Sequence, residues 1–469
     1  MLKITSAHLM LPTRCSTTPA IQNETMMATE SPSLVRDMVQ NVIHEESCKA
    51  QRACEANGCT SEGAFSKHMD STVLKAPDNW YYPLDIANDL QGVALPSPVK
   101  HEIFATAFEY TRCVIPSYVS WDRYVGFMRI FIMGIIAEFK GELVNVAAGD
   151  DVLGYSLSHV LSSVFAGMPG HDDMAREFRT FLLVTAEKTS GKRNGELFRR
   201  YVNSLAQSPA QWFRIRDTDA LCRFTIAAAL ACNEVYDVWF SEAQFQVLSE
   251  LGDIMYDAVS FYKHRSEGET NSSFAYFPSD MSNRQAVYRK ARELLWALDV
   301  AWAPDRRMAH VTNFIRPFGG PIHMMMRRYR FVEENLTIGQ PEDASVIEQT
   351  RNNFKLWNRV DADDHVSQKS SAEDVTRYQN LLSRSDFLMF DGLAQFLEKP
   401  EADFCKACKF RHSYGAQRPH QFGGAMICED CKHHIWQPYL DSMEQRALAA
   451  FPELEPVLYR DVRNGVNAL

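Results

Sequence analysis

The sequence has no long apolar run and no excess of positive charge. Its longest apolar run, residues 125–139, contains Arg129 and is shorter than the roughly 20 residues that a membrane-spanning helix needs. Lys and Arg number 49 against 59 Asp and Glu, which gives a formal net charge of −10. We therefore expect no membrane span and no general nucleic-acid binding, because phosphate backbones are bound by basic surfaces.

The chain also lacks the features of a secreted protein. Residues 1–21 contain no apolar segment of about 7–15 residues followed by a small-residue cleavage site. The 11 cysteines are odd in number and unevenly spaced, which is untypical of a disulfide framework. These absences predict a cytoplasmic protein whose cysteines are thiols or metal ligands.

Three segments differ in composition. Residues 1–75 are rich in Ser, Thr, Asn, Glu and Met without any periodicity, which predicts a disordered N-terminal tail. Residues 76–400 form the predicted helical domain, which includes a capping box formed by Ser241 and Gln244. From residue 76 to about residue 340 we find no alternating strand pairs joined by Asn-Gly or Asp-Gly turns, and therefore expect no strand pair there. This segment is therefore predicted to be an all-α bundle. For residues 401–469 we expect a small Cys-rich module and a terminal helix.

Two Cys-x-x-Cys pairs form the most specific local motif. Cys405 and Cys408 are followed, after 19 residues, by Cys428 and Cys431. Four thiolates at this spacing predict a tetrahedral zinc site. Sulfur at all four positions leaves no open coordination position, so the zinc is expected to be structural. Two alternatives stay open, namely two unrelated redox pairs and the replacement of one cysteine ligand by a nearby histidine.

The segment 123–144 is predicted to be a central helix, because it is apolar on nearly every face. Glu138 and Glu142 are spaced i, i+4 near its C-terminal end, where the helix dipole and their mutual repulsion both disfavour negative charge. A divalent cation or a cationic side chain from a neighbouring helix is expected to compensate them. A solvated helix end is the alternative.

A second predicted helix, residues 241–265, carries one apolar stripe and one polar stripe. The polar stripe consists of Asp253, Asp257, Ser260 and His264, spaced 4, 3 and 4 residues apart. Such a group can hold Mg²⁺, which prefers oxygen ligands and is often shared with substrate phosphates. An ordinary solvent-exposed helix face is the alternative.

Arginines flank this second helix in the sequence. Arg216 precedes Asp257 by about forty residues, and the segment 327–330, Arg-Arg-Tyr-Arg, follows Asp257 by about seventy. The planar guanidinium group is well suited to binding phosphate oxygens. Each cluster alone is also compatible with a solvated face, but together with two acidic faces they favour a site for a phosphorylated substrate.

The order of these groups resembles that of class I terpene synthases. The segment 256–264 resembles that family's second metal motif, Asn-Asp-x-x-Ser-x-x-Lys-Glu, with Tyr256 in place of Asn and His264 in place of Glu. Arg216 resembles the family's diphosphate-sensing arginine, and Arg328-Tyr329 resembles its Arg-Tyr pair. The earlier helix has no Asp-Asp-x-x-Asp motif, so the metal ligands must differ from the usual set.

Longer blocks are similar to the α-ionylideneethane synthases of fungal abscisic acid biosynthesis. The similarity extends from about Ala76 to about Pro452, with clear blocks that begin at Trp80, Tyr256, Gly319 and Asn353. The resemblance implies that the substrate is farnesyl diphosphate and that the product is the cyclic hydrocarbon α-ionylideneethane. It also implies passage through neutral acyclic polyenes, with proton removal and return inside the site.

These observations lead to a hypothesis for the site residues. The predicted catalytic residues are Glu138, Glu142, Asp257 and Tyr329. The predicted diphosphate ligands are Arg216, Lys263, Arg327 and Arg328. The predicted Mg²⁺ ligands are Glu138, Glu142, Asp253, Asp257, Ser260 and His264. The predicted Zn²⁺ ligands are Cys405, Cys408, Cys428 and Cys431.

Two other functions stay open. One is a different prenyl-diphosphate enzyme, which forms another terpene or transfers the prenyl group. The other is an adaptor whose zinc module binds protein or nucleic acid. The adaptor is disfavoured because the Cys-rich segment is only mildly basic. The oligomeric state does not follow from the sequence.

Overall fold

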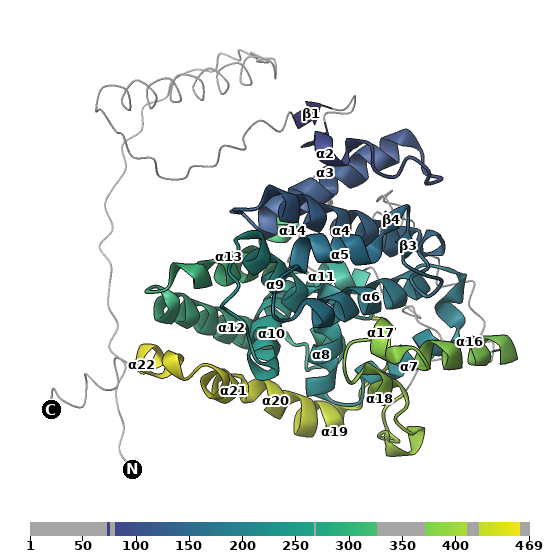
Figure 1. The fold of residues 1–469 in the computed structure, drawn as a ribbon. Coiled ribbons are helices and arrows are strands. Elements are labelled where there is room, and N and C mark those ends of the chain that lie inside the picture. Colours follow the sequence, from purple (N-terminus) through teal and green to yellow (C-terminus); the bar gives the residue numbers. More distant parts are fainter. Residues whose placement is uncertain (1–72, 76–79, 267–268, 326–370, 410–421, 460–469) are drawn as a thin grey trace, which may run out of the picture. The chain divides into compact units, whose positions relative to one another are not determined.

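The computed structural model describes residues 73–75, 80–266, 269–325, 371–409 and 422–459. These residues are mostly helical, which confirms the predicted all-α, terpene synthase-like class (Figure 1). The helices of the first half are α2 (Leu84–Ala87), α3 (Ser97–Val114), α4 (Trp121–Phe139), α5 (Leu157–Phe165), α6 (His171–Lys188), α7 (Glu196–Leu205), α8 (Pro209–Ala220) and α9 (Cys222–Cys232).

The second half continues the bundle and adds the C-terminal segment. Its helices are α10 (Glu242–Val259), α11 (Phe261–Ser266), α12 (Met281–Trp302), α13 (Ala309–Phe318), α14 (Ile322–Met325), α16 (Ala372–Leu382), α17 (Ser385–Leu388), α18 (Leu393–Leu397), α19 (Glu429–Cys431), α20 (Gln437–Asp441), α21 (Met443–Ala450) and α22 (Glu455–Leu458). The shorter helical turns are η1 (Gly141–Leu143), η2 (Gly191–Asn194), η3 (Ser273–Ala275), η4 (Arg306–Met308), η6 (Glu401–Asp403), the π-helix η7 (Lys432–Trp436) and η8 (Pro452–Leu454).

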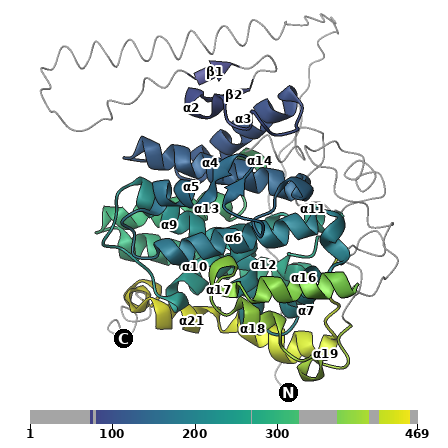
Figure 2. The ribbon, with the colours of Figure 1, turned by 45° about the vertical axis from the view of Figure 1, so that its right-hand side comes forward.

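Helix α4 is central, as its sequence predicted. It is buried on most faces and packs against α3, α5 and α6 (Figure 2). The helix ends at Phe139, however, so the predicted extension to residue 144 is wrong. A Cβ atom at Gly141 would lie 2.3 Å from the carbonyl oxygen of Ala186 in α6. The chain therefore leaves α4 at a glycine, a poor helix former, where it must approach α6 closely.

Two short hairpins accompany the helices. Strand β1 (Val73–Lys75) pairs with β2 (Tyr81–Pro83), and β3 (Asp151–Val152) pairs with β4 (Tyr155–Ser156), both antiparallel. The expectation that residues 76–340 contain no strand pair is therefore wrong. The β3–β4 turn uses Leu153 and Gly154, both with positive φ, which matches a type I′ hairpin turn. Type I′ turns usually have Asn, Asp or Gly in the first central position, so Leu153 did not indicate a hairpin in the sequence.

The second predicted helix is present with one interruption. The capping box of Ser241 and Gln244 is confirmed, because each side-chain oxygen accepts a hydrogen bond from the backbone N–H of the other residue. Helix α10 ends at Val259, Ser260 forms its C-cap, and α11 begins at Phe261. The backbone N–H of His264 still donates to the carbonyl of Ser260 at 2.8 Å, so the helical direction continues across this break.

The C-terminal segment packs onto the bundle. Helix α21 contacts α10 and α12, and α18 contacts α7 (Figure 1). Glu250 of α10, which is buried, accepts hydrogen bonds from Tyr439 and Arg446. Among the residues that the structure describes, packing therefore continues across the boundary predicted near residue 400. None of the described helices has the length and apolarity that crossing a membrane requires.

Candidate active site

A buried ion pair joins α8 and α10, which pack against each other. Arg216 Nη2 donates to Asp257 Oδ1 at 3.1 Å, and Arg216 Nη1 donates to Asp219 Oδ2 at 2.7 Å. Arg216 is 5% exposed and Asp257 is fully buried. The structure thus brings together the predicted diphosphate ligand Arg216 and the predicted metal ligand Asp257, which are 41 residues apart.

The second carboxylate oxygen of Asp257 is held by a turn. The backbone N–H and the hydroxyl of Ser273 donate to Asp257 Oδ2 at 2.7 and 2.5 Å. In the same segment, the side-chain amide of Asn271 donates to Asp219 Oδ1 at 2.6 Å. Asp219, Asn271 and Ser273 were not among the predicted site residues. For Asn271 and Ser273 the sequence signal was the run of polar residues from 269 to 273.

Asp253 lies one helical turn before Asp257 and is fully buried. Among the described residues, neither of its carboxylate oxygens has a hydrogen-bond partner. Burial raises the pKa of Asp253 well above its usual range; Arg216 counteracts this effect, whereas Asp257 adds to it. A buried carboxyl group without partners costs folding free energy and therefore indicates a functional role.

We call Arg216, Asp219, Asp253 and Asp257 the acidic cluster. Burial opposes the charged form of Arg216, but the three carboxylates raise its pKa well above the usual range. When all three carboxyl groups are ionised, the one guanidinium group leaves these four side chains with a formal charge of −2. A divalent cation would balance that charge, and carboxylate oxygens are the ligands that Mg²⁺ prefers. The residues present therefore fit a Mg²⁺ ion.

Burial also raises the pKa of Asp257, although Arg216 and the hydrogen bonds from Ser273 counteract this effect. The neighbouring Asp217 belongs to a different pair. It accepts hydrogen bonds from the backbone and the side chain of Arg223, at 2.8 and 2.5 Å. Asp217 therefore pairs with Arg223 and lies outside the group formed around Arg216.

The residues that follow Asp257 lie at the same end of α10. His264 Nδ1 lies 3.7 Å from Asp257 Oδ1 and 3.1 Å from the hydroxyl of Ser260. That hydroxyl donates to the carbonyl of Tyr256 at 2.8 Å. Lys263 is 5% exposed. The predicted polar stripe is therefore buried at the end of α10, and its reading as a solvent-exposed face is wrong.

Tyr256 connects this group to a second buried histidine. The ring centre of Tyr256 lies 4.3 Å from that of His323 and 5.7 Å from the guanidinium carbon of Arg216. His323 is fully buried in α14. His323 lies in the similar block that begins at Gly319, but no sequence pattern marked it as a site residue.

The two predicted glutamates do not share one helix face. Glu138 is half-buried in the last turn of α4, whereas Glu142 lies beyond that helix in η1. The Glu142 side chain is 53% exposed and pairs with Lys140 at 3.5 Å. The prediction that both glutamates lie near the end of one helix, spaced i, i+4, is therefore wrong for Glu142, because α4 ends before it.

Arg327, Arg328 and Tyr329 lie outside the described residues. They follow α14 directly in the sequence. Their assignment to diphosphate binding and catalysis stays a prediction.

The four C-terminal cysteines lie together. Their sulfur atoms are all within 4.8 Å of one another, and the Sγ atoms of Cys405 and Cys428 are 3.9 Å apart. A tetrahedral zinc site with Zn–S bonds of about 2.3 Å places its sulfurs about 3.8 Å apart. Backbone N–H groups near Cys405 lower the pKa of its thiol to about 7. The predicted ligand set thus has a geometry that can hold a metal ion.

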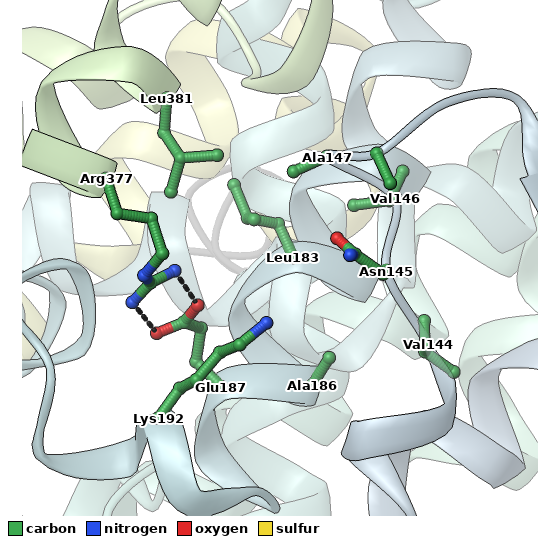
Figure 3. A pocket seen from close by; sticks show the side chains of 11 residues that line it. Val144, Asn145, Val146, Ala147, Leu183, Ala186, Glu187, Lys192, Arg377 and Leu381 are labelled. Atoms are coloured by element: carbon green, nitrogen blue, oxygen red, sulfur yellow. Dashed lines mark hydrogen bonds and ion pairs between the residues drawn. The ribbon is translucent and has the colours of Figure 1, made fainter. Parts of the chain in front are cut away.

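A small cavity lies at a different place in the bundle (Figure 3). It measures about 240 Å³ and is lined by Val144, Asn145, Val146, Ala147, Ala148, Leu183, Ala186, Glu187, Lys192, Arg377 and Leu381. Glu187 and Arg377 are paired by two hydrogen bonds of 2.5 and 3.0 Å. No predicted site residue lines this cavity, and ligand pockets are usually larger, about 300–1,000 Å³. We therefore do not assign it to the active site.

Comparison with known proteins identifies the family. The family model described as α-ionylideneethane synthase aba3 matches residues 78–453. α-Ionylideneethane synthase aba3 of Botryotinia fuckeliana is 61% identical over 383 residues, which cover 82% of this chain and 85% of that protein. α-Ionylideneethane synthase abl3 of Leptosphaeria maculans is 59% identical and covers 81% of this chain and 87% of its own length. The protein of that name from Pyricularia oryzae is 51% identical and covers 80% and 83%. This chain therefore belongs to the α-ionylideneethane synthase family.

Proposed function

We propose that the protein converts farnesyl diphosphate to α-ionylideneethane and diphosphate, a step toward abscisic acid. The names of its relatives support the product, and the acidic cluster supports a diphosphate substrate. The observation on which the proposal mainly rests is the buried Asp253 carboxyl group, which has no partner among the described residues. It lies next to a buried arginine and one helical turn from Asp257.

The reaction requires loss of the allylic diphosphate. The bond between the allylic carbon and oxygen breaks, and its electron pair stays on the diphosphate. Mg²⁺ held by Asp253 and Asp257 would supply charge neutralisation for this leaving group. Arg216 and Lys263 are the cationic side chains of the described site, and we assign them to bind the phosphate oxygens. Formation of the hydrocarbon also requires that the substrate-derived cation lose one proton.

The substrate-derived cation must be kept away from water. Trp212 and Phe213 are fully buried and pack against Phe277, so they belong to a dry aromatic region next to Arg216 in the sequence. Trp296 is 59% exposed on α12 and cannot serve this purpose. We therefore assign the shielding role to aromatic side chains of α8 and its neighbours.

The first test is the reaction itself. Purified protein incubated with farnesyl diphosphate and Mg²⁺ should release α-ionylideneethane, measured by gas chromatography with mass spectrometry. Release of a different hydrocarbon would contradict the product assignment. Chain extension of an added prenyl acceptor would favour the prenyl-transfer alternative. Membership in a family of synthases disfavours the adaptor alternative.

Arg328 provides a prediction for the part of the site outside the described residues. Arg328→Ala should slow turnover and weaken inhibition by inorganic diphosphate, because the same charge would bind substrate and leaving group. We expect both effects to be on the order of tenfold or more, from steady-state kinetics with diphosphate as inhibitor. Unchanged kinetics in a folded variant would remove Arg328 from the site.

We further propose that the metal at the four cysteines is zinc with a structural role. Metal analysis of the purified protein should give one zinc per chain, and Cys428→Ser should lose the metal and lower the thermal stability. Cys113→Ser, at a half-buried cysteine of α3 outside the motif, is the matched control and should keep the metal. A wild-type protein without zinc would contradict the assignment.

A further inference from the structure

Residues close in sequence to the four cysteines contact the same short segment of chain as the acidic cluster. We call residues 269–277 the Ser273 turn. One side of this turn donates hydrogen bonds from Asn271 and Ser273 to Asp219 and Asp257. The residues at its end, Tyr276 and Phe277, are buried and turn toward the Cys-rich segment.

The contact on the second side starts directly after a cysteine ligand. Cys431 ends α19 and leads without interruption into the π-helix η7, which ends at Trp436. The indole ring of Trp436 stacks on Tyr276, with ring centres 5.5 Å apart and an interplanar angle of 20°. It also meets Phe277 edge to face at 4.9 Å. Trp436 is 2% exposed, so these contacts are fully buried.

The residues before the second cysteine pair add backbone contacts. The N–H of Gly423 donates to the carbonyl of Glu269 at 3.0 Å. A Cβ atom at Gly424 would lie 2.7 Å from the hydroxyl oxygen of Tyr276, and the φ of Gly424 is +78°. Only glycine allows this approach without strain. Both ends of the Ser273 turn are thus held by residues within eight positions of a cysteine ligand.

A displacement of one side of the Ser273 turn also displaces the other side, because the turn is short and its backbone is hydrogen-bonded internally. The backbone N–H groups of Tyr276 and Phe277 both donate to the carbonyl of Ser273 at 3.0 Å. A shift of Tyr276 therefore moves Ser273, whose N–H and hydroxyl fix one oxygen of Asp257. Buried hydrogen bonds and close-packed rings resist such shifts.

We propose that the metal at the four cysteines positions Asp257 through Trp436 and the Ser273 turn, and so sets the affinity of the acidic cluster for Mg²⁺ and diphosphate. Trp436 and Ser273 are positioning residues in this arrangement. The affinity part of the inference rests on the proposed function, whereas the positional part does not.

Amide hydrogen exchange on the full chain tests the positional part. Removal of the metal with a chelator should increase exchange in residues 269–277, and exchange in the central helix α4 should stay unchanged. Equal protection of the Ser273 turn with and without metal would overturn the inference. This measurement does not depend on which substrate the protein uses.

Binding of inorganic diphosphate in the presence of Mg²⁺ tests the affinity part. Trp436→Leu should keep one zinc per chain and weaken the affinity by about tenfold, since it loosens a hydrogen bond to a charged group. Ser273→Ala should weaken it by a similar factor, and the double variant should show less than the sum of the two effects. Trp436→Phe, which keeps an aromatic ring, should recover most of the affinity.

Trp296→Leu, which removes an exposed indole from α12, is the matched control and should bind diphosphate normally. Trp436→Leu with reduced thermal stability but normal diphosphate affinity would overturn the inference, as would additive effects in the double variant. A wild-type protein that does not bind diphosphate would instead contradict the proposed function, and the exchange measurement would still decide the positional part.

Discussion

Asp253→Asn is expected to reduce hydrocarbon formation by at least about a hundredfold while raising the stability of the metal-free protein. The loss of activity follows because the substitution removes one of the carboxylates that we assign to Mg²⁺, and charge stabilisation of this kind contributes on the order of 10²–10³ in rate. The gain in stability follows because a buried carboxyl group, whose oxygens have no hydrogen-bond partner among the described residues, is replaced by a neutral amide of the same shape.

The stability gain should depend on pH. Burial raises the pKa of Asp253 well above its ordinary value of 3.8, so above pH 3.8 the folded state binds more protons than the unfolded state. The wild-type stability therefore falls as the pH rises from about 4 through the folded-state pKa, and asparagine has no such dependence. Thermal unfolding without divalent cations should show a small gain near pH 4 and a larger one at neutral pH.

Ligand addition separates this explanation from a general effect on packing. Mg²⁺ with inorganic diphosphate should raise the melting temperature of the wild type, because a ligand of the folded state stabilises it, and should not raise that of Asp253→Asn. Asp172→Asn, at a side chain that is 96% exposed in the first turn of α6, is the matched control and should behave as the wild type. Near-normal turnover by Asp253→Asn would remove this residue from the metal site.

Arg216→Met should have the opposite effect on stability. Methionine keeps much of the side-chain volume but leaves Asp257 and Asp219 without their cationic partner. Removal of one member of a buried ion pair typically costs about 3–5 kcal/mol. We expect a decrease of this size in the free energy of unfolding, measured by urea denaturation, together with loss of detectable hydrocarbon formation.

Two further variants make this prediction specific. Asp257→Asn combined with Arg216→Met should be less destabilising than the sum of the single effects, because the charge left uncompensated by the arginine substitution is then absent. Arg216→Lys keeps the charge but loses the planar fork, so we expect intermediate stability and activity. Arg289→Met, on an exposed position of α12, should change neither quantity. An additive double variant would show that Arg216 and Asp257 do not act as a pair.

The sequence by itself determined the helical class, the acidic face of α10 and the four-cysteine group. Each of these depends on short-range spacing along the chain. The polar stripe of Asp253, Asp257, Ser260 and His264 follows from the helical period, and the cysteine group follows from two knuckles of fixed length. The capping box at Ser241 is local for the same reason.

Only the tertiary structure decided which of these groups act together. Asp219 and Ser273 join Asp257 through the packing of α8, α10 and η3, and no local pattern encodes that contact. Glu142 leaves the predicted group because α4 ends where Gly141 must approach α6, a steric requirement set by a helix that is distant in sequence. The contact of Trp436 with Tyr276 likewise depends on long-range packing, which brings the cysteine segment against the segment that orients Asp257.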